Sequence, residues 1–288
     1  MTPSPEGPAA AAAPPRDPSR TQPVAIAAGA RRPPSGIRKA WIALRSAVYL
    51  LLLAVTVAPY SIFSLLCIVT PHPLRYWLIT GWPKTALWLA RVVCGIRYEV
   101  TGWENLPEGP AVLLPKHQSA WETIWLIASM PRPSSFVYKR ELHRIPFFGW
   151  GIATLGMISI DRARGTDAFE QVVEQGQKRL AEGWFVIIFP EGTRTAPGTH
   201  MRYKTGGARL AVRAGVPAVP IALNSGELWP RKAFLKIPGT ITVSIGPPVD
   251  TRGRSAGEVA RMTERWIETE MRRIAPHRYP QEPAAGNG

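Results

Sequence analysis

Downstream of Tyr98, short apolar runs alternate with longer amphipathic stretches along the chain. The runs have the length and apolar content of buried strands, whereas the stretches between them have helical spacing. Such alternation predicts an α/β layered domain with a largely parallel central sheet flanked by helices. Pro238 and Gly239 predict a hairpin turn, and Ser255 and Glu258 predict a capping box. The expected strands are 111–116, 135–139, 156–161, 184–190, 218–223 and 240–245, and the expected helices are 121–130, 166–182, 205–214 and 255–275.

A different pattern occupies residues 40–98, before this domain. No Asp, Glu, Lys or Arg occurs from Ser46 to Leu74, and about 20 apolar residues are enough to span a bilayer. Pro59 lies within this run and is expected to kink or end a helix. The following stretch carries tryptophans and basic residues around an apolar face, which is typical of a helix in the lipid headgroup region.

The placement of basic residues favours a hairpin over a single membrane crossing. Arginines and lysines before Ser46 should remain cytoplasmic, so a single crossing would place the main domain outside. A membrane-associated two-helix hairpin keeps that domain on the cytoplasmic face of the inner (cytoplasmic) membrane; a single crossing and a buried core helix are the alternatives. The expected divisions are a disordered Pro- and Ala-rich tail at 1–39, the helical hairpin at 40–98, the α/β domain at 99–276 and a flexible tail at 277–288.

The composition narrows the class of partner. Thirty-five Lys and Arg against 20 Asp and Glu give a net charge of +15, so an anionic membrane, a phosphate-bearing substrate, an acidic protein or nucleic acid is expected. The 11 tryptophans favour a membrane interface. The basic residues are scattered and no nucleic-acid-binding motif occurs, which disfavours nucleic acid. The two cysteines form neither a disulfide framework nor a zinc pattern.

Polar side chains follow four of the predicted strands, at the positions where ligands gather in open α/β sheets. Because parallel strands end at one edge of a sheet, these side chains can converge. A histidine, carboxylates and several cations suit base catalysis on a phosphorylated substrate. No third ligand clusters with the histidine and its carboxylate, which disfavours a metal site. In chain order the side chains are His117, Lys139–Arg140, Asp161–Arg162 and Glu191-Gly192-Thr193-Arg194.

Two of these clusters each allow a catalytic and a purely structural interpretation. Glu122 lies one helical turn beyond His117 and can orient its imidazole for proton abstraction. Ser119-x-x-Glu122 is equally a capping box that would start the helix at 121–130. In "FPEGTR", Gly192 can serve only a tight turn or can form an anion-binding nest. Arg194 is then either a surface charge or a bidentate phosphate ligand.

The chain resembles the lysophosphatidic acid acyltransferase (1-acyl-sn-glycerol-3-phosphate acyltransferase) family over about residues 40–250. "KHQSAWE" (116–122) resembles that family's first motif, an HX4D-type pattern with Glu122 in place of the usual aspartate. "GMISIDR" (156–162), preceded by "YKRELHRIPFFG", resembles the second motif, "FPEGTR" (189–194) the third, and "VPAVPIAL" (216–223) the fourth. The order and spacing of all four together make the resemblance specific.

The resemblance implies transfer of a fatty acyl group from acyl-ACP or acyl-CoA to the sn-2 hydroxyl of lysophosphatidic acid, without a cofactor or a covalent acyl-enzyme. It implies that His117 is the general base and that Glu122 orients it. The implied phosphate ligands are Lys139, Arg162 and Arg194, and the implied acceptor pocket is shaped by Glu191, Gly192 and Thr193. The remaining alternatives are a related acyltransferase acting on lyso-ornithine lipid or glycerol 3-phosphate, and a non-enzymatic basic membrane protein that binds nucleic acid.

Overall fold

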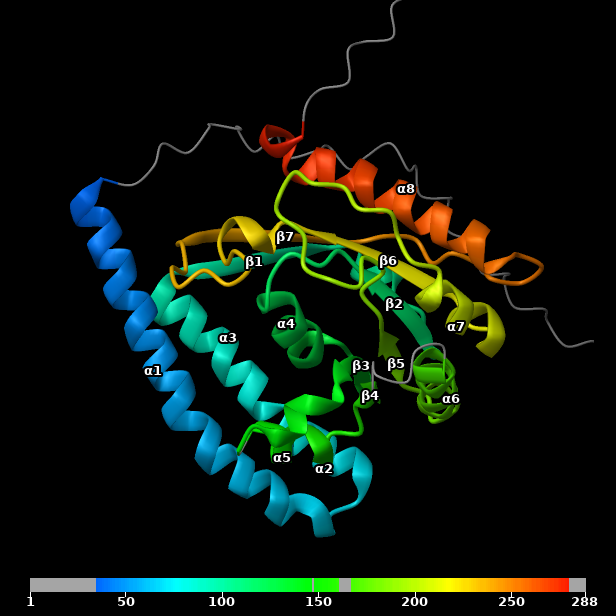
Figure 1. Cartoon of the computed structure of the whole chain (residues 1–288), viewed down its shortest axis with the longest axis horizontal. Helices are drawn as coiled ribbons and strands as arrows, with labels where there is room; N and C mark the ends of the chain where they lie inside the picture. The colour runs from blue at the N-terminus through cyan, green and yellow to red at the C-terminus, as the bar shows by residue number, and fades with distance from the viewer. Residues whose placement is uncertain (1–34, 147, 161–166, 280–288) are drawn as a thin grey trace, which may run out of the picture. The chain divides into compact units, whose positions relative to one another are not determined.

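The computed structural model describes residues 35–146, 148–160 and 167–279. Most of the tail expected at 1–39, Arg162 and most of the tail expected at 277–288 lie outside the described residues. Eight α-helices and seven strands are described (Figure 1). The helices are α1 Gly36–Leu66, α2 His72–Ile79, α3 Gly81–Cys94, α4 Trp121–Ser129, α5 Phe148–Thr154, α6 Asp167–Ala181, α7 Gly206–Ala214 and α8 Ala256–Ile274.

One sheet organises the described residues from Ile96 onward. Its strands are β1 Ile96–Thr101, β2 Ala111–Pro115, β3 Ser134–Lys139, β4 Ile158–Ile160, β5 Phe185–Ile187, β6 Ala218–Leu223 and β7 Gly239–Ile245. They are ordered β1-β7-β6-β2-β5-β3-β4, and every pairing is parallel except β6 with β7. The predicted α/β class with a largely parallel sheet is confirmed.

Helices cover both faces of this sheet, because successive side chains of its central strands are all apolar. Ala111 and Leu113 of β2 pack in the cluster that holds α3 and α4 residues. Val112 and Leu114 face the other way, into the cluster formed with α6, α7 and α8. β2 is buried along its whole length, so its packing fixes the position of the two residues that follow it, the buried Lys116 and then His117.

Two details of the strand prediction were wrong. β1 was not predicted, because Ile96–Thr101 is not a continuous apolar run and adjoins the preceding amphipathic stretch. It is largely exposed at the sheet edge, and the expected boundary after Tyr98 falls inside it. The hairpin at Pro238 and Gly239 does not form, since residues 234–237 are not a strand. That segment is held instead against α1, where the Lys236 backbone N–H donates to Ser46 Oγ at 2.8 Å.

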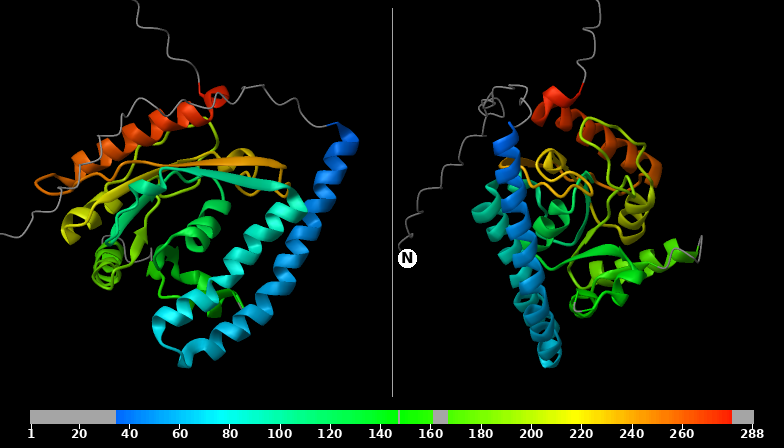
Figure 2. Two further views of the ribbon diagram at one scale, coloured as in Figure 1. Left: turned by 180° about the vertical axis from the view of Figure 1, so that it is seen from behind. Right: turned by 60° about the vertical axis from the view of Figure 1, so that its left-hand side comes forward.

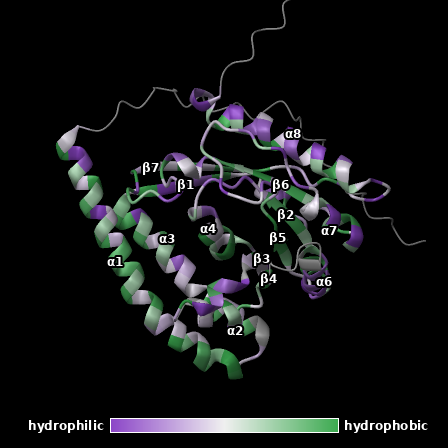
Figure 3. Ribbon diagram, viewed as in Figure 1, coloured by the Kyte–Doolittle hydropathy of each residue, from purple (hydrophilic) through white to green (hydrophobic). Residues whose placement is uncertain are grey.

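The N-terminal apolar run forms one long helix that continues through Pro59 to Leu66. Over Gly36–Val69 it is long and apolar enough to cross a membrane, with 17% of its most apolar window buried. Apolar positions recur along α1 (Figure 3). α3 packs beside α1 as the chain returns toward the sheet (Figure 2). Of the two outcomes expected at Pro59, a kink or an end of the helix, the end does not occur, and the chain does return as a second helix.

Candidate functional site

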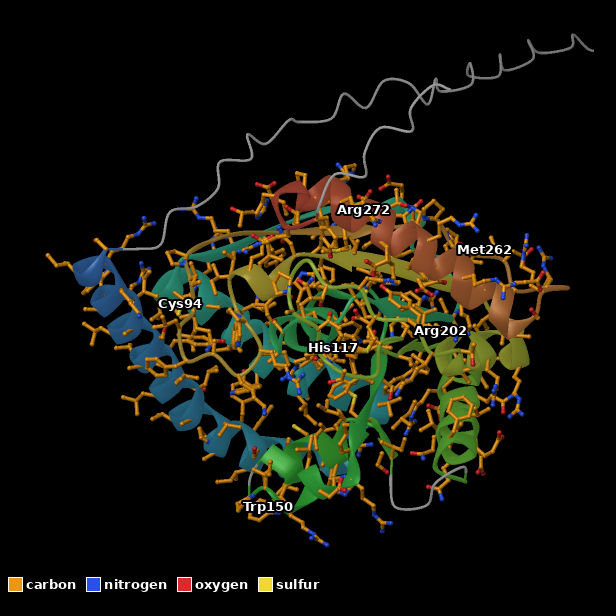
Figure 4. The ribbon with its side chains drawn as sticks, turned by 45° about the horizontal axis from the view of Figure 1, so that its top comes forward. Cys94, His117, Trp150, Arg202, Met262 and Arg272 are labelled. Atoms are coloured by element: carbon orange, nitrogen blue, oxygen red, sulfur yellow. The ribbon has the colours of Figure 1, made fainter. Side chains whose placement is uncertain are left out.

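The structure brings two of the four predicted clusters together at one edge of the sheet. β2 and β5 are parallel neighbours, so the segments that follow them run side by side. The His117 backbone N–H donates to Glu191 Oε2 at 2.7 Å. The Thr195 backbone N–H donates to the His117 carbonyl at 2.8 Å. His117 lies at the centre of the view in Figure 4.

Glu122 contacts the imidazole of His117 directly. His117 Nδ1 lies 2.9 Å from Glu122 Oε1, and the Glu122 carboxylate is fully buried. Because a carboxylate oxygen accepts, Nδ1 carries the proton and Nε2 keeps its lone pair. The ring of Phe189 stacks on the imidazole with centroids 3.7 Å apart, which fixes the plane of the ring.

Three further donors hold the Glu122 carboxylate. The backbone N–H groups of Gln118 and Ser119 each donate to Oε1 at 2.7 Å. The Ser225 hydroxyl donates to Oε2 at 2.6 Å. Burial raises the pKa of Glu122, but the hydrogen bonds from His117, Ser225 and Ser119 outweigh it and hold that pKa below its ordinary value. The carboxylate is therefore ionised beside the imidazole.

The expected capping box at Ser119 is only half formed. α4 begins at Trp121, and Ser119 Oγ accepts from the Trp121 backbone N–H at 2.8 Å rather than from that of Glu122. Glu122 still accepts from the Ser119 backbone N–H, as the second half of such a box requires. One carboxylate thus both satisfies free backbone donors and orients the histidine. The box expected at Ser255 and Glu258 is complete.

A buried ion network lies directly beneath His117. Lys116 Nζ lies 2.8 Å from Glu191 Oε1 and 2.7 Å from Glu268 Oε1, and the Lys116 side chain is fully buried. The Tyr203 hydroxyl also donates to Glu268, at 2.9 Å. Burial raises the pKa of Glu191, and Lys116 offsets part of that rise. Glu191 therefore supports the His117 backbone from inside the protein.

The cations expected to bind phosphate differ in how the structure places them. Arg194 is half-buried, and its Nε has no hydrogen-bond partner among the described residues. Thr193 is exposed. Gly192 adopts φ +69°, where an added Cβ would lie 3.0 Å from Lys204 Nζ. The Lys139 side chain and Arg162 lie outside what the structure describes.

A cavity of about 230 Å³ opens beside the imidazole. His117, Gly192 and Lys204 line its polar part, and apolar side chains line the rest. Among the described residues, no group of three or more His, Cys, Asp or Glu side chains could hold a metal ion. The site therefore offers a base, an anchored carboxylate and nearby cations next to an apolar space.

Sequence reasoning missed Ser225, Lys204 and Phe189. Ser225 follows β6, a neighbour of β2, so the strand-end rule that found His117 could have found it. Lys204 precedes α7 and is placed by its backbone N–H, which donates to the Pro190 carbonyl at 2.8 Å. No pattern in the sequence indicates that contact.

Comparisons with known proteins agree with this geometry. The family described as Acyltransferase matches residues 97–224. The chain is 43% identical over 239 residues to a 1-acyl-sn-glycerol-3-phosphate acyltransferase of Pseudomonas aeruginosa, covering 81% of this chain and 93% of that one. It is 34% identical over 173 residues to the human 1-acyl-sn-glycerol-3-phosphate acyltransferase alpha, covering 59% of this chain and 61% of that one.

A solved structure has the same fold. The crystal structure of the 1-acyl-sn-glycerophosphate (LPA) acyltransferase from Thermotoga maritima matches with a TM-score of 0.68 and 23% identity. The match covers 83% of this chain and 96% of that one. The shared fold therefore spans most of the chain rather than the sheet alone.

Proposed function

Because this chain belongs to the 1-acyl-sn-glycerol-3-phosphate acyltransferase family, we propose that it transfers a fatty acyl group to the sn-2 hydroxyl of lysophosphatidic acid and forms phosphatidic acid. The observation that supports this most is the 2.9 Å contact between His117 Nδ1 and the buried Glu122 carboxylate. It leaves Nε2 as the basic nitrogen of a histidine that lines a cavity.

The proposed chemistry is a direct transfer with His117 as base. Nε2 removes the proton from the sn-2 hydroxyl as its oxygen attacks the thioester carbonyl carbon of acyl-ACP or acyl-CoA. The C–S bond then breaks, and the departing thiolate takes the proton from the imidazolium. Glu122 stabilises that imidazolium and holds the reactive tautomer. Atoms and charges balance without a covalent acyl-enzyme.

The acceptor's phosphate is proposed to bind on the side of His117 that carries the cations. Arg194, with its unpartnered Nε, supports this assignment, and Lys204 adds a second cation beside Gly192. Lys139 and Arg162 remain candidates from the family resemblance. Gly192 and Thr193 shape the approach, whereas Glu191 acts from beneath by fixing the His117 backbone.

The apolar N-terminal helix supports association with a membrane. We propose that α1 and α3 form a hairpin in the inner (cytoplasmic) membrane, with the catalytic domain on the cytoplasmic face. Single cysteines introduced at Arg38 and at Arg202 should then react with an impermeant thiol reagent from the same side. Labelling from opposite sides would show a single crossing instead.

An acceptor panel tests the proposed reaction. Purified protein is given acyl-ACP or acyl-CoA with lysophosphatidic acid, glycerol 3-phosphate or lyso-ornithine lipid, and each acylated product is quantified. Lysophosphatidic acid should give the highest kcat/KM, and one thioester should be the better donor. A higher kcat/KM for another acceptor would assign the chain to a related acyltransferase. Salt-dependent DNA binding without any acyl transfer would make it a binding protein.

A further inference from the structure

A second and larger hollow lies away from the catalytic histidine. Its volume is about 880 Å³, and it is formed by the end of α1, the start of α2, α5 and the end of α6. Trp150 of α5 lines it and is 46% exposed, and it lies well apart from His117 in Figure 4. We call this hollow, lined among others by Leu65, Ile68, Arg75, Trp150, Lys178 and Arg179, the α5–α6 cleft.

The α5–α6 cleft lies where the parallel strands begin, whereas the site around His117 lies where they end. Trp184 lines the cleft and immediately precedes β5, whereas His117 follows the far end of the parallel strand β2. Phe185, next to Trp184, pairs with Ala111 at the start of β2. From Ala111 to His117 the chain runs roughly 20 Å, at about 3.3 Å per residue, and this length separates the cleft from the site. The cleft is thus a separate site.

The charged side chains of the α5–α6 cleft favour the binding of an anion. Arg75, Lys178 and Arg179 are basic, and Glu182 is the single acidic residue among the described residues that line the cleft. Arg75 donates from one terminal nitrogen to the Ile68 carbonyl at 3.1 Å, but its Nε is buried without a hydrogen-bond partner among the described residues. Arg179 pairs with the partly exposed Glu182 at 2.6 Å, and such surface pairs are weak enough for a phosphate to compete. Two guanidinium groups and an ammonium suit a phosphate.

The other wall of the α5–α6 cleft is apolar. It continues onto α1, the helix that is long and apolar enough to cross a membrane. Leu65 and Ile68 line the cleft, and the adjoining Leu66 and Val69 are 70% and 87% exposed. A soluble phosphate compound would gain nothing from this surface, whereas a lipid with a phosphate headgroup would use both walls. A partly exposed tryptophan such as Trp150 is typical of the headgroup boundary of a membrane.

We propose that the α5–α6 cleft binds an anionic phospholipid, with its phosphate between Arg75 and Lys178 and its acyl chains against the end of α1. A lipid bound in this cleft would take no part in the reaction above, because the cleft lies away from His117. It would fix the end of the apolar helix relative to α6 at the membrane surface. The proposal goes beyond acyl transfer and does not depend on it.

Native mass spectrometry of the full chain from nonionic detergent micelles tests the proposal. The probes are phosphatidylglycerol and phosphatidylcholine with the same acyl chains. We expect selective retention of one phosphatidylglycerol per chain. At about fivefold in affinity per cation, Lys178→Gln should weaken retention about fivefold, and Arg75→Gln with Lys178→Gln about thirtyfold. The matched control, Arg254→Gln with Arg261→Gln, removes two exposed charges near the start of α8 and should leave retention unchanged.

Two further measurements distinguish lipid binding in the cleft from lipid binding at the catalytic site and from binding of a soluble phosphate compound. Arg194→Ala should retain phosphatidylglycerol as the wild type does, and millimolar glycerol 3-phosphate should not displace it. Equal retention of both lipids, undiminished retention by the Lys178→Gln variant, or loss of the lipid in Arg194→Ala would each overturn the proposal. Displacement by glycerol 3-phosphate would instead assign the cleft to soluble phosphates and also overturn it. Because the readout is lipid retention, these results stand apart from any failure of the acyl-transfer assay.

Discussion

Four donors converge on the Glu122 carboxylate: the imidazole of His117, the hydroxyl of Ser225 and two backbone N–H groups. A buried charge is tolerated only when it is compensated in this way. Since the folded-state pKa of Glu122 is lowered, its contribution to stability is present above the unfolded-state pKa of a glutamate. That contribution is lost as the pH falls through the lower folded-state value.

Ser225 is expected to act by positioning Glu122. Ser225→Ala removes a 2.6 Å donor to a buried carboxylate, which should cost about 1.5–3 kcal/mol of unfolding free energy. Because the carboxylate then turns less firmly toward His117, kcat should fall roughly tenfold with KM unchanged. Urea unfolding and steady-state kinetics check this. Ser135→Ala is the control, since Ser135 is buried but donates to the Gly156 carbonyl instead; an equal loss of kcat there would contradict the assignment.

Arg194 is expected to bind the phosphate of the acceptor. Removing a charge-assisted contact should cost about 1.5–3 kcal/mol, so Arg194→Ala should raise the KM for lysophosphatidic acid by roughly ten- to a hundredfold. The KM for the acyl donor should change much less. Arg254→Ala removes an exposed charge elsewhere and should change neither value. Equal increases in both KM values for Arg194→Ala would remove Arg194 from the phosphate site.

At this scale the sequence indicates individual chemical groups but not their contacts. The pairing of His117 with Glu122 is predictable because His117 follows a predicted strand and Glu122 lies about one helical turn further along the chain. Ser225 lies 103 residues from Glu122, and Lys116 meets Glu268 152 residues away. Such contacts follow from the tertiary arrangement of strands and helices, which spacing along the chain does not encode.

Three elements meet at the ion network below His117. Lys116 follows β2, Glu191 follows β5, and Glu268 belongs to α8. Because Lys116 is the residue before His117, its buried side chain connects α8 to the strand end that carries His117. The network thus joins α8 and the ends of β2 and β5 to the backbone of His117.

Removing the α8 carboxylate from this network should lower the unfolding free energy more than removing an exposed carboxylate from the same helix. Glu268→Gln leaves Lys116 with Glu191 alone, so the unfolding free energy should fall by about 2–4 kcal/mol. Glu264→Gln removes only an exposed pair with His200 and should cost under about 1 kcal/mol. Denaturant unfolding measures both. Equal costs for the two variants would show that the buried network contributes no more than a surface pair.

Most elements could be predicted from the hydrophobic pattern, and the failures have identifiable causes. The buried strands β2, β5 and β6 are continuous apolar runs, whereas β1 is an exposed edge strand whose polar residues conceal it. The segment before β7 has an apolar pattern, but it packs against α1 rather than pairing with β7. Pro59 does not end α1, because a proline removes only its own backbone donor and the helical turns on either side keep their hydrogen bonds.

At the scale of the whole chain, an apolar helix accompanies a catalytic α/β unit. Leu51 and Val55 of α1 are 63% and 61% exposed, a cost that a soluble protein would avoid but that a membrane removes. Leu51→Lys with Val55→Lys should therefore shift the protein from the membrane fraction toward the soluble fraction in vesicle flotation. Lys substitutions at the exposed Thr199 and His200 serve as the control. Unchanged flotation of the α1 variant would exclude this face as the membrane contact.

The central claim is that His117 deprotonates the acceptor while Glu122 orients it, and the rate of phosphatidic acid formation by Glu122→Gln tests this most directly. A glutamine can still accept from the backbone donors, so the variant should fold, with a loss of about 1–3 kcal/mol. It cannot stabilise an imidazolium as a carboxylate does, so kcat should fall by about 10²- to 10⁴-fold. His117→Ala should be at least as slow, and Glu122→Asp should retain more activity than Glu122→Gln. A folded Glu122→Gln enzyme that forms phosphatidic acid within a few fold of the wild-type rate would contradict the account.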